Sequence, residues 1–322
     1  MTTSFDSLQF GPRLDIAARS FVGGGPGARA ENQDNFLLVD VTGLAHFLYG
    51  QDHIQQRIPG WTVGHARIAV LDGMGGHGQG REAAEAVVAS LLALPPITSI
   101  TQLSDQLDAL HTTLQHTFAL DCPAAGRPGT TLTMLELPPG QAGLLYHVGD
   151  SRLYELREGR VSVLTIDHVP ATGCAMEGVL GEDGWWRQVH GEHRSQISQA
   201  FILGNAFTDS AELADPLFPL SPDKLPPYLR HLPDRRVLEL APGSLYLLAT
   251  DGFWSCTNPA AWVASWPAIL EGSVSAKDVC DRLFSAMLER PPTGVHPDNL
   301  TAIVLRPLAS EESALPGGGK DA

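Results

Sequence analysis

Three short apolar segments of the sequence run into an aspartate, and this feature most restricts how the chain can fold. The segments are ARIAVLD, LLYHVGD and SLYLLATD, and they end at Asp72, Asp150 and Asp251. Acidic side chains are rarely buried unless an opposite charge or a metal ion accompanies them. The surrounding motifs contain too few lysines and arginines to pair with all three. A single Asp-Gly pair is usually only a turn, but three strand-terminal acids together favour a metal site.

The residue types around these aspartates indicate which metal such a site would take. Glycines follow Asp72 and Asp251 directly, and a glycine lets the backbone come close to a ligand. The carbonyl of Gly73 is therefore itself a candidate ligand. Hard carboxylate oxygens, without cysteine or clustered histidine, suit Mg²⁺ or Mn²⁺ rather than Zn²⁺.

Composition excludes several other classes of protein. The formal net charge is −15 and the sequence pI is about 5.1, which argues against a nucleic-acid binder and against charge-driven docking on an anionic membrane. No apolar stretch approaches the ~20 residues that span a bilayer. The first residues lack the basic start and apolar run of a signal peptide. The four cysteines form no CxxC pair, so we expect reduced, mostly buried thiols in a cytoplasmic protein.

Hydrophobic periodicity predicts the order of the secondary structure. We expect strands over residues 13–22, 33–40, 66–72, 130–137, 143–149, 152–157, 161–166, 244–250 and 299–306, and helices over 80–94, 101–120, 259–270 and 276–289. Long runs of neighbouring strands favour antiparallel sheets over a βαβ series. The sequence therefore predicts an α+β fold, a four-layer α-β-β-α sandwich of two mainly antiparallel sheets flanked by helix pairs.

Two segments do not fit this regular pattern. Residues 41–66 contain Gly43, Gly50, Pro59 and Gly60 as breakers, so we expect an irregular insert there. Residues 168–236 are rich in proline, glycine and tryptophan and have no clean period.

Six short motifs carry a resemblance to a known family. They are R-x-x-N-Q-D at 29–34, D-G-M-G-G-H at 72–77, G-T-T at 129–131, V-G-D-S-R at 148–152, T-D-G at 250–252 and D-N-L-T at 298–301. In this order and spacing the set resembles the metal-dependent protein phosphatase family (protein phosphatase 2C, or PPM-type), and D-G-M-G-G-H resembles its bacterial branch. The matches run from about residue 14 to 306. They imply one phosphatase domain over residues 1–308 and a variable flap at about 168–236. The tail at 309–322 is small and polar, so we expect it to be disordered.

The resemblance implies a role for each acidic position. Asp72 would bridge two core Mn²⁺ or Mg²⁺ ions. The Gly73 carbonyl and Asp34 would complete the surroundings of one ion, partly through water, and Asp251 and Asp298 would hold the other.

Three further residues complete the implied site. Asp150 would help to hold a third, more labile ion beside Asp251. Arg29 would grip the substrate phosphate, because its planar fork can donate two charge-assisted hydrogen bonds. His77 is a candidate proton donor to the leaving oxygen, and the alternative is a structural or water-binding role.

Residues near the motifs are expected to support the site. Thr130 and Thr131 should act by packing and hydrogen bonding. Ser151 has no evident activating base, so we expect a structural role, and Arg152 is expected to pair with nearby acids. Histidines without metal-ligand spacing are expected to be structural or exposed; these are His147, His168, His190 and His193.

The function implied by the resemblance is hydrolysis of phosphoserine and phosphothreonine in proteins by a metal-bridged hydroxide. The expected partners are a phosphorylated protein and an opposing serine/threonine kinase in bacterial signalling. Other phosphatase chemistries lack their motifs, because neither C-x5-R nor G-D-x-H-G occurs. Two alternatives stay open: a non-catalytic phosphatase-fold binding module, and a narrow-specificity regulator of one phosphoserine switch protein.

Overall fold

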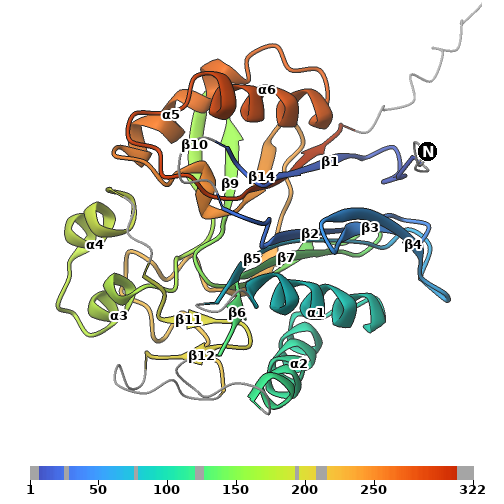
Figure 1. Cartoon of the computed structure of the whole chain (residues 1–322), viewed down its shortest axis with the longest axis horizontal. Helices are drawn as coiled ribbons and strands as arrows, with labels where there is room; N and C mark the ends of the chain where they lie inside the picture. Colours follow the sequence, from blue (N-terminus) through green and yellow to red (C-terminus); the bar gives the residue numbers. More distant parts are fainter. Residues whose placement is uncertain are drawn as a thin grey trace, which may run out of the picture.

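Two antiparallel β-sheets packed face to face form the centre of the fold, and a helix pair covers each outer face (Figure 1). The structure is a computed structural model that describes residues 7–24, 29–75, 79–119, 127–192, 196–207 and 216–309. This arrangement confirms the predicted α-β-β-α sandwich. No helix in these ranges is long and apolar enough to cross a membrane.

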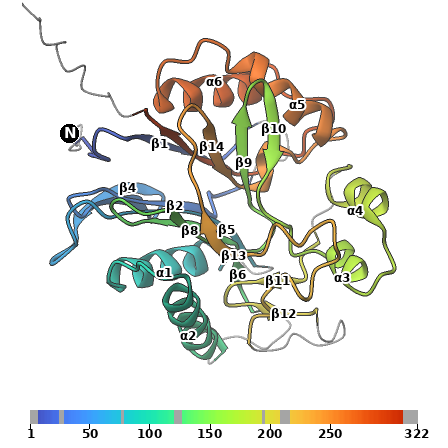
Figure 2. The ribbon, with the colours of Figure 1, turned by 180° about the vertical axis from the view of Figure 1, so that it is seen from behind.

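The smaller sheet joins the two ends of the chain. Its strand order is β1-β15-β14-β9-β10, and its members are β1 Leu14–Phe21, β9 Arg152–Arg157, β10 Arg160–Val163, β14 Leu245–Ala249 and β15 Leu300–Pro307. The helices α5 (Pro259–Ile269) and α6 (Ala276–Glu289) lie on its outer face (Figures 1 and 2).

The larger sheet has the order β13-β8-β7-β5-β2-β3-β4, and β6 pairs with an extension of β5. Its members are β2 Asp34–Val39, β3 Leu44–Tyr49, β4 Asp52–Arg57, β5 Ala66–Met74, β6 Gly129–Thr130, β7 Leu132–Leu137, β8 Gly143–Val148 and β13 Arg235–Leu238. The helices α1 (Gly80–Ala93) and α2 (Ile100–Ala119) cover its outer face (Figure 1).

Side-chain alternation along the central strands explains the layers. In β5, Ile68 and Val70 join the core between the two sheets. Their neighbours Ala69 and Leu71 point to the opposite face and pack in the cluster that includes α1 and α2. A strand that is apolar on both faces is buried on both sides, which is why ARIAVL is apolar at every position except Arg67.

The expected irregular insert at residues 41–66 was wrong, because β3 and β4 form a regular antiparallel hairpin within it. Gly50, which we took as a breaker, is the first residue of the two-residue turn of this hairpin. Strand β4 lies at the edge of the sheet and its side chains are largely exposed, so it needs no apolar alternation.

The irregular region at 168–236 contains two short helices, α3 (Pro170–Met176) and α4 (Glu182–Val189), and the short strands β11 (Gln199–Ala200) and β12 (Gly204–Asn205). A separate small core of buried apolar side chains holds it together, and Trp185 is part of this core. Its neighbour Trp186 is about half exposed. The tail beyond Ala309 lies outside the described residues.

A buried ion pair fixes α1 to the larger sheet. Arg67 on β5 and Glu136 on β7 are fully buried, and a guanidinium nitrogen of Arg67 lies 2.6 Å from a carboxylate oxygen of Glu136. The Glu136 carboxylate also contacts the ring of His65. Arg67 then donates to carbonyls at the end of α1 and just beyond, those of Leu91, Leu94 and Pro95. A cation at this position compensates the partial negative charge of a helix C-terminus.

We expect Arg67→Ala to destabilise the protein by about 3–5 kcal/mol, because it leaves Glu136 buried without its cation. Chemical denaturation monitored by circular dichroism measures this change. The double variant Arg67→Met/Glu136→Leu removes both charges and should recover much of the loss. An Arg67→Ala variant as stable as the parent would contradict this role of the pair.

Candidate active site

Strands from both sheets deliver acidic side chains to one end of the sandwich. In the register of β2 and β5, Asp34 lies directly opposite Asp72. Asp150 follows the end of β8, Asp251 follows the end of β14, and Asp298 precedes the start of β15. Since β14 and β15 are hydrogen-bonded neighbours, the last two acids come from adjacent chain segments of the smaller sheet.

These strand ends surround a cavity of about 330 Å³. The predicted site residues that line it are Arg29, Asp72, Gly73, Asp150, Asp251 and Asp298. Asp34 is buried and does not line the cavity; its carboxylate accepts a hydrogen bond of 2.7 Å from the Thr250 hydroxyl. His77 lies outside the described residues.

Glycine at two positions is required by close backbone contacts. A Cβ atom on Gly73 would lie 2.2 Å from the carbonyl oxygen of Gly80, and one on Gly252 would lie 2.0 Å from that of Asn299. Any larger residue would displace these backbones. The glycines of D-G-M-G-G-H and T-D-G therefore let the neighbouring segments close around the acids.

Crowding of carboxylates makes the site electrostatically unfavourable without a cation. Burial, together with the nearby charges of Asp34 and Asp251, raises the pKa of Asp72 well above its ordinary value. Burial also raises the pKa of Asp34 to about 8, although hydrogen bonds from Thr250 and Thr301 partly oppose this. Desolvated like charges favour the neutral acid, and a bound cation would restore the ionised form.

Arg29 is the one cationic side chain in the described lining of the cavity. Its Nε and Nη2 atoms donate to both carboxylate oxygens of Asp298, at 2.9 and 3.1 Å. The arginine side chain is about half exposed. The sequence predicted separate roles for Arg29 and Asp298, but the structure joins the two side chains, so a change at Arg29 also acts on Asp298.

The donor set fits Mn²⁺ or Mg²⁺ with water completing the coordination. Among the described residues, no three Asp, Glu, His or Cys side chains form a preformed metal site. Arg29 and Thr250 hold the carboxylates of Asp298 and Asp34. Magnesium usually keeps several waters and binds through one or two carboxylates, so the cluster suits such an ion better than an all-protein cage.

Two hydroxyl residues, directly before β7 and directly before β9, support Asp72. The Asp72 amide donates to the Thr131 hydroxyl, which shares a 2.7 Å hydrogen bond with the buried Ser151 hydroxyl. Both side chains act through hydrogen bonding within the protein, as the sequence indicated. Arg152 pairs with Asp167 at 2.7 Å, which confirms its predicted acidic partner.

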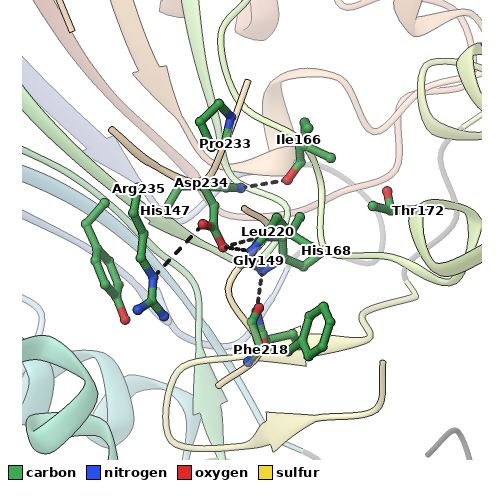
Figure 3. A network of polar contacts seen from close by, with 12 residues as sticks. His147, Gly149, Ile166, His168, Thr172, Phe218, Leu220, Pro233, Asp234 and Arg235 are labelled. Carbon is green, nitrogen blue, oxygen red and sulfur yellow. Dashed lines mark hydrogen bonds and ion pairs between the residues drawn. The ribbon is translucent and has the colours of Figure 1, made fainter. Parts of the chain in front are cut away.

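A buried histidine network anchors the loop that carries Asp150 (Figure 3). The backbone of His168 donates to the carbonyl of Gly149, and its Nδ1 atom accepts from the Gly149 amide at 3.3 Å. Asp234 lies 3.6 Å from the other ring nitrogen and accepts from the amide of Leu220. Burial lowers the pKa of His168 well below its ordinary value, so the ring is neutral. The network ties Gly149 to the 168–236 region.

Sequence reasoning missed several residues that shape the cavity. Asn299 lines it and accepts at 2.8 Å from the amide of Gln33, and Gln196 and Ile197 contribute from the 168–236 region. The D-N-L-T motif contains Asn299 and could have identified it. Nothing in the sequence pattern marks Gln196. His147, His168 and His190 are buried as structural histidines, and His193 lies outside the described residues.

Comparison with known proteins confirms the expected resemblance. No protein-family model matches the chain. The serine/threonine protein phosphatase PstP of Mycobacterium tuberculosis is 26% identical over 245 residues, which are 75% of this chain and 40% of the relative. The aligned part of the chain thus spans less than half the length of this curated relative.

Solved structures show the same fold. The serine/threonine phosphatase Stp1 from Staphylococcus aureus has a TM-score of 0.62 at 18% identity and covers 95% of this chain and 100% of its own. The catalytic domain of PstP in complex with two manganese ions has a TM-score of 0.57 at 22% identity, covering 92% and 99%. The α-β-β-α sandwich of this chain is therefore the fold of PPM-type phosphatases.

The carboxylate cluster predicts how the metal-free protein responds to pH. Between the ordinary pKa of Asp34 and its folded value of about 8, the folded protein binds more protons than the unfolded chain, so stability falls as pH rises. Buried histidines with lowered pKa values act in the opposite direction, but only below about pH 6.5. In excess EDTA, the melting temperature should therefore fall from about pH 7 to about pH 8.

Asp34→Asn should flatten this dependence and raise the melting temperature at the alkaline end by ~2–4 °C, the effect of roughly 1 kcal/mol. Scanning calorimetry across the pH range measures both effects. Asp105→Asn, at an exposed position of α2, is the matched control and should leave the slope unchanged. A melting temperature independent of both pH and Asp34→Asn would contradict the electrostatic account.

Proposed function

We propose that this chain is a metal-dependent protein-serine/threonine phosphatase. The observation that carries the proposal is the cavity at the strand ends, where clustered aspartates meet one arginine whose planar guanidinium offers two parallel donors, the geometry that suits phosphate. The relatives that share the fold are named as serine/threonine phosphatases, and one of them holds two manganese ions.

The acids of the cluster divide between the proposed ions. Asp72 would contact both core ions, with the Gly73 carbonyl and Asp34 on one side and Asp251 and Asp298 on the other. Asp150 would hold a third. When bound, the divalent ions supply an activated water and offset charge on the phosphoryl oxygens.

The chain's own residues orient the substrate. Arg29 would donate two parallel hydrogen bonds to phosphoryl oxygens, which fixes the phosphorus in line with the attacking water. For this contact, the guanidinium of Arg29 would turn from Asp298 toward the substrate, or it would bridge Asp298 and the phosphate. His77 remains the proposed proton donor to the departing seryl or threonyl oxygen. A phosphate dianion can bind beside the acids of the cavity only once cations have offset the negative charge of their carboxylates.

An enzyme is favoured over the non-catalytic binding module. A module without catalysis would have no use for an acid as crowded as Asp72, whose pKa burial and neighbouring carboxylates raise well above its ordinary value. The described site nevertheless keeps Asp72, Asp150, Asp251 and Asp298 around one cavity. The narrow regulator of one switch protein would use the same chemistry, and only its substrate range would differ.

We also propose a cellular context for the enzyme and the bounds of its domain. The chain would oppose a bacterial serine/threonine kinase, which the bacterial relatives support. A reducing compartment such as the cytoplasm is supported by the free thiols of Cys174, Cys256 and Cys280. The pairing of β1 with β15 supports a single phosphatase domain over residues 1–308.

Activity should depend on added divalent metal. We expect EDTA to abolish hydrolysis of a phosphothreonine peptide and Mn²⁺ or Mg²⁺ to restore it, because the acids cannot hold the substrate phosphate without cations. Asp72→Asn and Asp251→Asn should each lower turnover at saturating metal by at least ~100-fold, while Asp105→Asn should not. Full activity in excess EDTA would falsify the metal mechanism.

Arg29→Ala should lower kcat/KM by about 10- to 150-fold, the effect of losing a charge-assisted contact of ~1.5–3 kcal/mol. Arg29→Lys keeps the charge but lacks the planar fork, so its kcat/KM should lie between that of the parent protein and that of Arg29→Ala. Steady-state kinetics at saturating Mn²⁺ measures the loss, and calorimetry reports any change in metal affinity through Asp298. Wild-type kcat/KM in Arg29→Ala would remove this residue from phosphate binding.

A further inference from the structure

The segment that brings Arg29 to the cavity has no regular secondary structure of its own. Side chains from distant elements hold its last residues in place. Asn299 accepts from the amide of Gln33 at 2.8 Å and donates to the carbonyl of Glu31 at 3.1 Å. Asn32 donates to the Ser20 hydroxyl on β1 at 2.8 Å. The placement of Arg29 therefore depends on contacts that the segment makes with its surroundings.

One of these contacts comes from the tip of the β3–β4 hairpin. The two turn residues, Gly50 and Gln51, have positive φ angles of 56° and 75°. A type I′ turn requires such angles and usually contains glycine, asparagine or aspartate. Glutamine is unfavourable there, and a non-glycine residue held at positive φ is often part of a functional site. The side-chain carbonyl of Gln51 accepts from the backbone amide of Asn32 at 3.1 Å.

A second connection runs from the same turn through α1. The Gly50 amide donates at 2.8 Å to Glu85, which also accepts from Arg81 at 3.0 Å. Arg81 then pairs with Glu31 at 3.1 Å, and the other carboxylate oxygen of Glu31 accepts from the Gln33 side chain. The hairpin tip is thus joined to residues 31–33 by two independent routes.

The contacts of residues 31–33 continue into the catalytic cavity. Gln33 lines that cavity, and its carbonyl accepts at 3.2 Å from the amide of Gly73, the residue after the central Asp72. A shift of the Asn32 backbone would therefore displace both Gly73 and Arg29, which lies three residues before Asn32.

We propose that the β3–β4 hairpin is a positioning arm for the phosphate-binding segment, and that Gln51 is its positioning residue. Gln51 is proposed neither as a metal ligand nor as a substrate contact; it fixes the backbone of Asn32, and through it the approach of Arg29 to the phosphate. The proposal rests on the proposed phosphatase function. Hydrogen exchange at Asn32 tests the contact separately from any activity.

The variants separate this role from simple folding. Gln51→Asn suits the turn at least as well, because asparagine tolerates positive φ, but its side chain is one methylene shorter and does not reach Asn32. Gln51→Glu keeps the length and an acceptor oxygen, so it should preserve the contact. Gln56→Asn makes the same chemical change at an exposed position of β4 and serves as the control.

We expect Gln51→Asn to raise KM for a phosphothreonine peptide by about 2- to 10-fold, the range of one net hydrogen bond. The kcat at saturating substrate and the Mn²⁺ affinity measured by calorimetry should stay within about twofold. Amide exchange at Asn32, followed by NMR, should accelerate by a similar factor. Gln51→Glu and Gln56→Asn should behave as the parent protein.

Two results would overturn the positioning role. One is an unchanged KM with unchanged protection of the Asn32 amide in Gln51→Asn. The other is a parallel loss of kcat, Mn²⁺ affinity and thermal stability, which would indicate general disruption. If the parent protein hydrolyses no phosphopeptide, the proposed function fails, while faster exchange at Asn32 in Gln51→Asn would still establish the contact.

Discussion

Mutual repulsion between buried carboxylates is the constraint on which the rest of this structure depends. Asp72 lies among Asp34, Asp150, Asp251 and Asp298, and burial together with these nearby charges raises the pKa values of Asp72 and Asp34 above their ordinary values. A chain selected only for stability would replace such acids with apolar residues. Their presence at the ends of well-packed strands is explained if divalent cations complete the site, because cation binding converts the repulsion into attraction.

The sandwich is what makes this crowding tolerable. Strands buried on both faces hold the ends of β5, β8 and β14 in fixed positions, so the acids cannot move apart to relieve their repulsion. Neighbouring hydroxyls complete the hydrogen bonding around the acids. The Thr131 hydroxyl accepts from the Asp72 amide, and the Thr250 hydroxyl donates to the Asp34 carboxylate. A rigid scaffold of this kind gives a preorganised electrostatic site, which is the usual source of catalytic power in phosphoryl transfer.

The sequence predicted the sandwich and the cavity acids because both leave local signals. Periodic apolar runs identify buried strands and helices, and an aspartate at the end of such a run is conspicuous. Strand β4 was missed because an edge strand is largely solvated and carries no apolar period. Long-range contacts were missed for a different reason. The bond from Gln51 to Asn32 and the pairing of Arg29 with Asp298 join residues far apart in the chain, and no local pattern encodes them.

Anomalous diffraction from crystals grown with Mn²⁺ tests the central claim most directly. The account predicts at least two anomalous peaks in the cavity, both at coordination distance of ~2.0–2.3 Å from carboxylate oxygens of Asp72, and their loss in crystals of Asp72→Asn. Crystals of the active protein with no anomalous peak within reach of Asp72 would contradict it.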